Sequence, residues 1–387
     1  MAPLQSPRLV ILALSLGGFA IGTTEFAAMA LLPYFSAALE VTEARAADAI
    51  SAYALGVVVG APTLAVLGAR MPRRMLLVWL MVAFAVFNTL SALSPTFGTM
   101  LAFRFLSGLP HGAYFGVAAL VAASVVPPGR RSAAVARVML GLTVATTLGV
   151  PVASVLGQTI GWRWGFGIVG LLALSTAAAV FVLAPREGPA PGANPLRELS
   201  ALGNRQVWLT LATGAIGFGG FFAVYTYLAS TLTSTMQAPA ATVPLMLMIA
   251  GAGMTMFTLV FGWAADRNQA LAGFAALGFG TLVLLAYPSA TVSLWTMAPA
   301  VFLVSVVGGL STVLQTRLMD VAGEAQQLAA ALNHSAFNVA NALGPFLAAR
   351  AIEAGYGFPS SGYVGAALSL AGMAIFAVTL WDARRRR

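Results

Sequence analysis

The sequence contains neither cysteine nor lysine, and charged residues make up only 8% of its 387 positions. The absence of cysteine excludes a thiolate nucleophile, a disulfide and a cysteine-ligated metal. The HExxH, GxSxG and phosphate-loop motifs are also absent, and the carboxylates do not cluster. We therefore expect no enzyme, no metal, no cofactor and no ATP-driven pump, so any work that the protein does must draw on a gradient.

Long apolar runs take the place of the missing charge. Hydrophobic residues make up 59% of the chain, and the mean hydropathy is +0.89. A transmembrane helix needs ~20 apolar residues, so about twelve crossings with short connections would use most of the chain. These features predict an all-α integral membrane protein with twelve transmembrane helices.

The apolar runs fall into two sets of six around a segment rich in proline and glycine. The predicted helices cover 9–39, 46–68, 75–93, 97–126, 138–160 and 165–184, then 207–233, 244–264, 270–287, 294–315, 329–350 and 362–381. This pattern predicts an N-terminal six-helix bundle at 1–184, a linker at 185–206 and a C-terminal six-helix bundle at 207–387. The first run is too long for a signal-peptide core, so we expect it to remain as a span.

The arginines indicate the topology. When successive loops are assigned to alternate sides, sixteen arginines fall on one side and three on the other. The positive-inside rule then places both termini and the linker in the cytoplasm. Because the basic residues follow the loops, we expect no nucleic-acid partner, and we interpret the arginines at 384–387 as a topology anchor.

The two sets of helices also share sequence. Residues 129–151 can be aligned with 323–345, and 68–70 with 264–267, at an offset of about 195 residues. Parallel repeats of six helices, with a substrate site between them near the membrane midplane, are a known transporter plan.

Two charged residues interrupt the predicted helices at a similar membrane depth, Glu25 in the first and Arg104 in the fourth. A charge in hydrocarbon is costly, so we expect both to face one cavity, paired directly or through water. Burial favours the protonated carboxyl and a nearby guanidinium favours the ionised form, so Glu25 could exchange a proton. The alternative is a structural ion pair that holds two helices together.

Other polar residues could line the same cavity. His111 lies two helical turns from Arg104, where it could relay protons or satisfy a carbonyl freed by Pro110. On the eleventh predicted helix, a polar stripe could line the cavity or bond between helices. The predicted cavity residues are Met29, Phe115, Phe222, Tyr225, His334, Asn338 and Asn341. A ridge of small residues, which favours close helix packing, consists of Gly108, Gly112 and Gly116.

Three segments carry a family resemblance: residues 18–33 read GFAIGTTEFAAMALLP, 104–112 read RFLSGLPHG and 161–166 read GWRWGF. With Gly141, Gly149 and Pro151, they resemble the major facilitator superfamily. The resemblance is closer to its twelve-span drug:proton antiporters, in the branch of bacterial sugar and small-solute efflux permeases. It implies a fold of two six-helix bundles, an acidic position at Glu25, and an arginine motif at Arg104 that is implicated in proton transfer. The bend at Gly149 and Pro151 resembles the motif thought to favour exchange.

The resemblance also implies gating motifs, from which the chain departs at two places. The loop after the second helix keeps Gly68, Arg70 and Arg73, but Ala69 stands at the acidic position and Pro72 where glycine is expected. Val150 separates Gly149 from Pro151. In the second half the corresponding motifs are intact, with Asp266 and Arg267 in the loop and Gly344 and Pro345 in the helix.

Together with the resemblance, these observations favour a transporter in the bacterial inner membrane that exports drug- or sugar-like small molecules in exchange for protons by alternating access. The expected proton-coupling residues are Glu25, Arg104 and His111. The alternative within transport is proton-coupled or facilitated uptake of a sugar-like solute. From another class, a receptor or scaffold remains open. The expected partners are a small-molecule substrate, protons and the lipid bilayer, and we expect a monomer.

Overall fold

The computed structural model describes residues 6–68, 71–127, 131–186, 202–322 and 326–385, and its regular elements in these ranges are all helices. The N-terminal half comprises α1 (Pro7–Ala30), α2 (Leu32–Ala38), α3 (Glu43–Ala46), α4 (Asp48–Gly68), α5 (Arg73–Ala92), α6 (Phe97–Ser124), α7 (Arg131–Val144), η2 (Ala145–Gly149), α8 (Val150–Thr159) and α9 (Trp162–Leu183).

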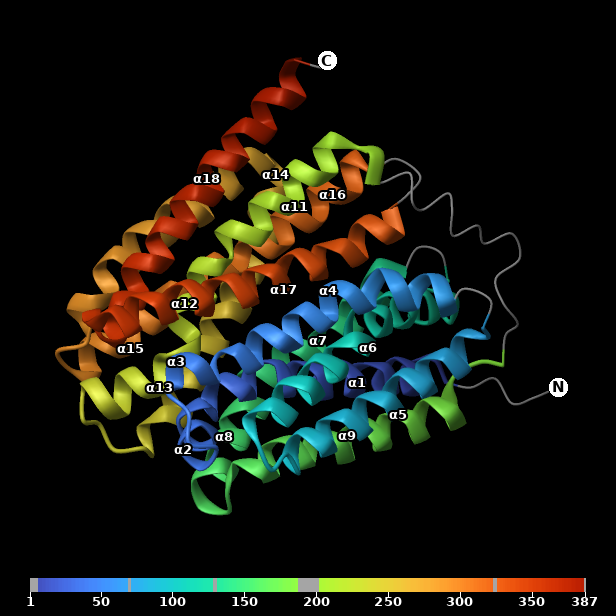
Figure 1. Cartoon of the computed structure of the whole chain (residues 1–387). Coiled ribbons are helices and arrows are strands. Elements are labelled where there is room, and N and C mark those ends of the chain that lie inside the picture. Colours follow the sequence, from blue (N-terminus) through green and yellow to red (C-terminus); the bar gives the residue numbers. More distant parts are fainter. Residues whose placement is uncertain (1–5, 69–70, 128–130, 187–201, 323–325, 386–387) are drawn as a thin grey trace.

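The C-terminal half begins after the linker. It comprises α11 (Arg205–Gly217), α12 (Gly219–Thr226), α13 (Leu228–Ser230), η4 (Thr231–Thr235), α14 (Thr242–Ala290), α15 (Leu294–Val304), η5 (Ser305–Gly309), α16 (Leu310–Val321), α17 (Gln326–Ala351), η6 (Ile352–Tyr356), η7 (Phe358–Ser360) and α18 (Ser361–Arg385). Figure 1 shows α2, α3 and α13 gathered at one end of the molecule, which we call the far end. The end at which α1 begins and α18 ends is the terminal end.

Eleven helical segments in the described ranges are long and apolar enough to cross a membrane. α14 contributes two of them, Thr242–Ala265 and Arg267–Ala290, and its backbone leaves the helical conformation at Asn268 (φ −152°, ψ 92°), near the start of the second. The predicted eleventh helix appears as α17, whose 26 residues match the others in length. Asn333, His334, Asn338 and Asn341 make its interior too polar for composition alone to mark it as a span.

Small residues bring α4 and α6 into close contact. Gly108 lies against the backbone of Tyr53 and Gly56, and a side chain there would collide with the Tyr53 carbonyl. Gly112 packs on Ala61 in the next turn. The predicted ridge is therefore confirmed at Gly108 and Gly112, whereas the described residues show no neighbour within 4 Å of a Cβ added at Gly116.

The fifth predicted helix is broken by the π-helical turn η2, just before Pro151. Gly149 closes this turn against Phe19 and Thr23 of α1. On another side of the turn, the backbone of Thr146 meets Gly251 of α14 in the other half. π-turns inside α-helices often mark functional positions. Here the turn lies where the two halves touch.

Hydrogen bonds join the two halves near the far end. The Ser230 hydroxyl donates to the Glu43 carboxylate, and the Ser51 hydroxyl donates to the Ala342 carbonyl at 3.2 Å. The Gln158 amide donates to the Ala240 carbonyl at 3.0 Å. This end of the interface between the halves is therefore closed in the structure.

Candidate functional site

Glu25 lies in α1 at the interface between the halves and is only 6% exposed. The Asn341 side-chain amide, from α17 of the other half, donates to Glu25 Oε1 at 3.4 Å. A buried carboxylate is tolerated when it accepts hydrogen bonds or lies near a positive charge. Glu25 has both, because the Arg104 charge also acts on it.

Arg104 lies in α6 and is fully buried. Its Nη1 donates to the Thr24 hydroxyl at 3.2 Å, and that hydroxyl donates to Asn88 Oδ1 at 2.6 Å. The guanidinium carbon lies 4.3 Å from the centre of the Tyr53 ring and 5.2 Å from that of Phe166. Aromatic faces attract a desolvated cation, so these rings stabilise Arg104 inside the N-terminal half.

Glu25 and Arg104 do not form a direct ion pair, which was one of the two predicted arrangements. Arg104 instead bonds to Thr24, the residue next to Glu25, and its Nε and Nη2 have no hydrogen-bond partner among the described residues. Direct ion pairs occur elsewhere, between Arg205 and Asp382 and between Arg350 and Glu353. The Glu25 carboxylate is therefore not tied to Arg104 by an ion pair, and its hydrogen-bond partner, Asn341, lies in the opposite half.

A second polar layer lies on the terminal side of the first. His111 is seven residues beyond Arg104 in α6, and His334 is seven residues before Asn341 in α17, which is about 10 Å along either helix. The two imidazole rings are 6.3 Å apart across the halves. His111 Nδ1 is hydrogen-bonded to the Tyr53 hydroxyl at 3.0 Å, while its Nε2 has no partner in the described chain.

The remaining predicted cavity residues meet at the same interface. His334 stacks on Phe115 at 5.3 Å with the rings 4° from parallel. Phe222 and Tyr225 of α12 contact the ring of Phe26 in α1, at 6.0 and 5.6 Å. Met29, one turn further along α1, is fully buried. The structure thus brings together α1, α6, α12 and α17, one pair from each half.

Sequence reasoning missed four members of this cluster. They are Thr24, Phe26, Tyr53 and Phe166. The three aromatic residues are common types on apolar helices, and nothing in their spacing separates them from packing residues. Only the fold shows that Tyr53 contacts both Arg104 and His111. A signal was available for Thr24, which immediately precedes the buried acid.

The predicted gating residues are distributed between the halves. Gly68 ends α4 against Leu76, and Arg73 begins α5. Gly344 of α17 packs on the backbone of Gly219 and Ala223. The Pro345 carbonyl accepts a hydrogen bond from the Tyr227 hydroxyl at 3.3 Å.

The gating loops themselves are only partly described. Arg70 and the side chain of Asp266 lie outside the described residues. Arg267 folds back on its own helix, where its guanidinium carbon lies 3.6 Å from the centre of the Trp263 ring.

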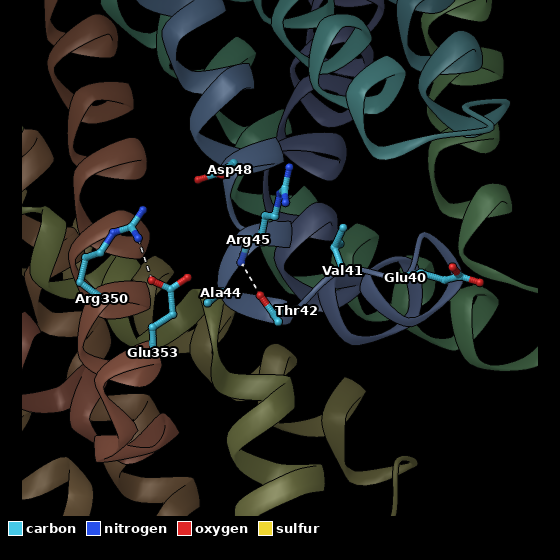
Figure 2. A pocket seen from close by; sticks show the side chains of 8 residues that line it. All are labelled: Glu40, Val41, Thr42, Ala44, Arg45, Asp48, Arg350 and Glu353. Carbon is cyan, nitrogen blue, oxygen red and sulfur yellow. Dashed lines mark hydrogen bonds and ion pairs between the residues drawn. The ribbon is translucent and has the colours of Figure 1, made fainter.

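A cavity lies at the far end, away from Glu25 and Asn341. It encloses about 490 Å³ between the loop before α4 and the end of α17. Figure 2 shows Arg45 and Asp48 on one side of it and Arg350 with Glu353 on the other, the latter two joined by an ion pair of 2.7 Å. A second cavity, beside Tyr225, measures only about 10 Å³.

Two helical halves with buried polar groups between them are the arrangement of many membrane transporters. Comparisons with known proteins assign the chain to such a family. The chain belongs to the Major Facilitator Superfamily, whose family model matches residues 14–330. The resemblance predicted from the motifs is therefore confirmed. Relatives of this kind are membrane transporters, which are not enzymes.

Two relatives and one solved structure illustrate the match. The chain is 38% identical over 372 residues to the inner membrane transport protein YdhP of Escherichia coli (strain K12), covering 93% of this chain and 94% of that protein. It is 34% identical over 338 residues to the chloramphenicol resistance protein of Streptomyces lividans, covering 85% and 86%. The crystal structure of a point mutant of the nucleoside transporter NupG has a TM-score of 0.79 at 11% identity, covering 97% of this chain and 100% of that one, which shows a common fold.

Proposed function

We propose that this chain is an antiporter that exports drug- or sugar-like small molecules from the bacterial cytoplasm in exchange for protons. Glu25 binds the proton, Arg104 tunes its release, and His111 belongs to the same pathway. The terminal end, with both termini and the linker at 185–206, faces the cytoplasm. α17, the eleventh predicted helix in chain order, also crosses the membrane. With it the number of crossing helices is twelve, in two six-helix bundles at 1–184 and 207–387.

The observation that carries the proposal is the hydrogen bond from Asn341 to Glu25 across the halves. When the halves separate at this level, Glu25 loses its amide donor and gains access to water. A carboxylate whose surroundings change in this way binds a proton in one state and releases it in the other. The fully buried Arg104 keeps a positive charge nearby throughout, which favours release.

The far-end contacts keep the two halves together on the side that we propose faces outward. Hydrogen bonds from Ser51, Gln158 and Ser230 tie the halves at that end. Alternating access requires these contacts to break when the protein opens outward, and rocking of the two repeats around the central site provides the motion.

The polarity of α17 supports its place as a crossing helix. Its polar side chains that face α1 and α6 are covered by the other half and do not meet lipid, since Asn338 and Asn341 are buried and His334 stacks on Phe115. Polar side chains within a membrane span normally face the protein interior in this way.

Chloramphenicol is the natural first cargo to test, because a relative is named for resistance to it. Purified protein is reconstituted in proteoliposomes, and radiolabelled drug is followed with an imposed pH gradient of either sign. We expect accumulation in vesicles that are acidic inside, with Glu25→Gln abolishing it and the far-end variant Glu353→Gln leaving it intact. Accumulation in vesicles that are alkaline inside would indicate symport and favour uptake of a solute instead.

A further inference from the structure

The polar atoms left without partners at the centre identify the chemistry of the cargo. Asn338 and Asn341 are 2% and 0% exposed, and the side-chain oxygen of each has no hydrogen-bond partner in the described chain. Their amide nitrogens are already used, by the His334 carbonyl and by Glu25. A buried acceptor without a donor lowers stability by about 1–3 kcal/mol, so a ligand that donates a hydrogen bond to either oxygen would remove this penalty.

Helical spacing places both asparagines on the face of α17 that meets the other half. His334 contacts Phe115 and His111 of α6, and Asn341 contacts Glu25 of α1. Asn338 falls between them, four residues after His334 and three before Asn341, which is the same helical face. The two acceptors are about 4.5 Å apart along the axis.

Aromatic side chains lie next to the residues that Asn341 and its helix contact: Phe26 follows Glu25 in α1, and Phe222 packs on Gly344, three residues after Asn341. Phe26 and Phe222 lie 6.0 Å apart near parallel, and Tyr225 meets the edge of Phe26. Tyr225 is buried, and its hydroxyl also lacks a hydrogen-bond partner among the described groups. Flat apolar bodies pack well on such rings.

Arg104 is held away from this surface, and its charge acts on Glu25, the acid that contacts Asn341. Arg104 is sealed inside the N-terminal half by Thr24, Tyr53 and Phe166, and the C-terminal half has no charged residue between positions 325 and 349. We infer that the site selects a neutral cargo with a flat apolar body that donates at least two hydrogen bonds, from hydroxyl or amide N–H groups, to Asn338 and Asn341. This inference rests on the proposed transport function and names the class of its substrate.

The test measures binding to the full chain in detergent at one pH, with no gradient. The probes are chloramphenicol, which is neutral and carries two hydroxyls and an amide N–H, its di-O-methyl ether, and the cation tetraphenylphosphonium. We expect the ether to bind at least about 10-fold more weakly than its parent, because two donors are lost. Asn338→Ala should weaken binding of the parent about 5-fold and leave binding of the ether unchanged.

Asn338→Asp adds a charge at the same position and should give measurable binding of tetraphenylphosphonium. The matched control is Asn333→Asp on the same helix, because Asn333 also has a buried oxygen without a partner among the described residues, but its amide donates to Gln315 of its own half. Equal binding of parent and ether, no binding of the parent, or the same gain of cation binding in both Asp variants would overturn the inference.

The outcome is separable from that of the proposed function. If this binding pattern holds but flux ignores the pH gradient, only the proton coupling fails. If the pH gradient drives export while the ether binds as well as its parent, only the substrate class fails.

Discussion

In the N-terminal half, the surface that faces the interface holds Glu25 beside the buried Arg104, whereas in the C-terminal half it holds Asn338 and Asn341. The helical plan of the halves is shared. Gly149 packs the broken fifth helix on α1, and Gly344 packs α17 on α12. The chemistry is not shared, since the segments 207–265, 268–316 and 325–349 carry no charged residue.

This difference shows how a duplicated chain can divide its work. An ionisable group and a cargo site make opposite demands, because the first needs a charge whose surroundings change and the second needs acceptors that favour one ligand. The two groups lie in separate halves, and the Glu25–Asn341 hydrogen bond connects the proton-binding residue to the cargo site. The predictions below test this division, beginning with the largest expected effect.

Moving the carboxyl across the interface gives the sharpest test. Glu25→Gln should lower gradient-driven export on the order of 100-fold, because the proton-binding group is lost. Adding Asn341→Asp places a carboxyl in the same contact from the other half, and export should recover to within about 10-fold of the native rate. Fluxes in proteoliposomes measure both. No recovery in a folded double variant would mean that the proton site depends on the N-terminal half alone.

The shared packing plan predicts equal sensitivity in both halves. Gly108→Val and Gly344→Val should each cost about 3 kcal/mol of stability, because the new side chain meets the backbone of a neighbouring helix. Gly167→Val in α9 is the control and should change stability by less than about 0.5 kcal/mol, since no described residue lies within 4 Å of its Cβ position. Thermal unfolding in detergent measures all three. A loss confined to one half would break the structural side of the comparison.

Tyr53 tests whether the second polar layer belongs to the proton pathway. Tyr53→Phe removes the hydroxyl bonded to His111, which leaves the imidazole free to change tautomer. Export should fall about 5-fold and its pH profile should shift, while exchange of cargo without net proton movement persists.

A second buried tyrosine in the same half provides the control for this test. Tyr114 donates to the Leu14 carbonyl at 2.7 Å, away from the interface. Tyr114→Phe should lower stability by about 1 kcal/mol and leave the pH profile unchanged. The same profile shift in both variants would refute the assignment of Tyr53.

The far-end charges should matter least. Arg350→Gln removes a partner of Glu353 in an exposed ion pair, and such pairs contribute about 0–1 kcal/mol. We expect less than about a twofold change in export, and even less difference at high salt because exposed charges are screened. A comparison of fluxes at low and high ionic strength checks this. A large loss would give the cavity in Figure 2 a role in transport that its exposure does not predict.

Part of this site was predictable because its residues break the pattern around them. Glu25 and Arg104 stand out in apolar runs, and the stripe of His334, Asn338 and Asn341 follows from helical spacing. The direct pairing considered for Glu25 and Arg104 could not be checked in the sequence, because it depends on the rotation of two helices about their axes. In the structure Arg104 turns toward Thr24, Tyr53 and Phe166.

The sequence by itself determined the membrane class, the order of the apolar helices, and the family. These properties follow from composition and from local periodicity, which need no knowledge of neighbours. Only the tertiary structure decided which polar atoms find partners, such as Asn341 for Glu25 and Tyr53 for His111. Those contacts join residues 316 and 58 positions apart. No local pattern encodes them, because they exist only once glycine crossings have set how closely the helices approach.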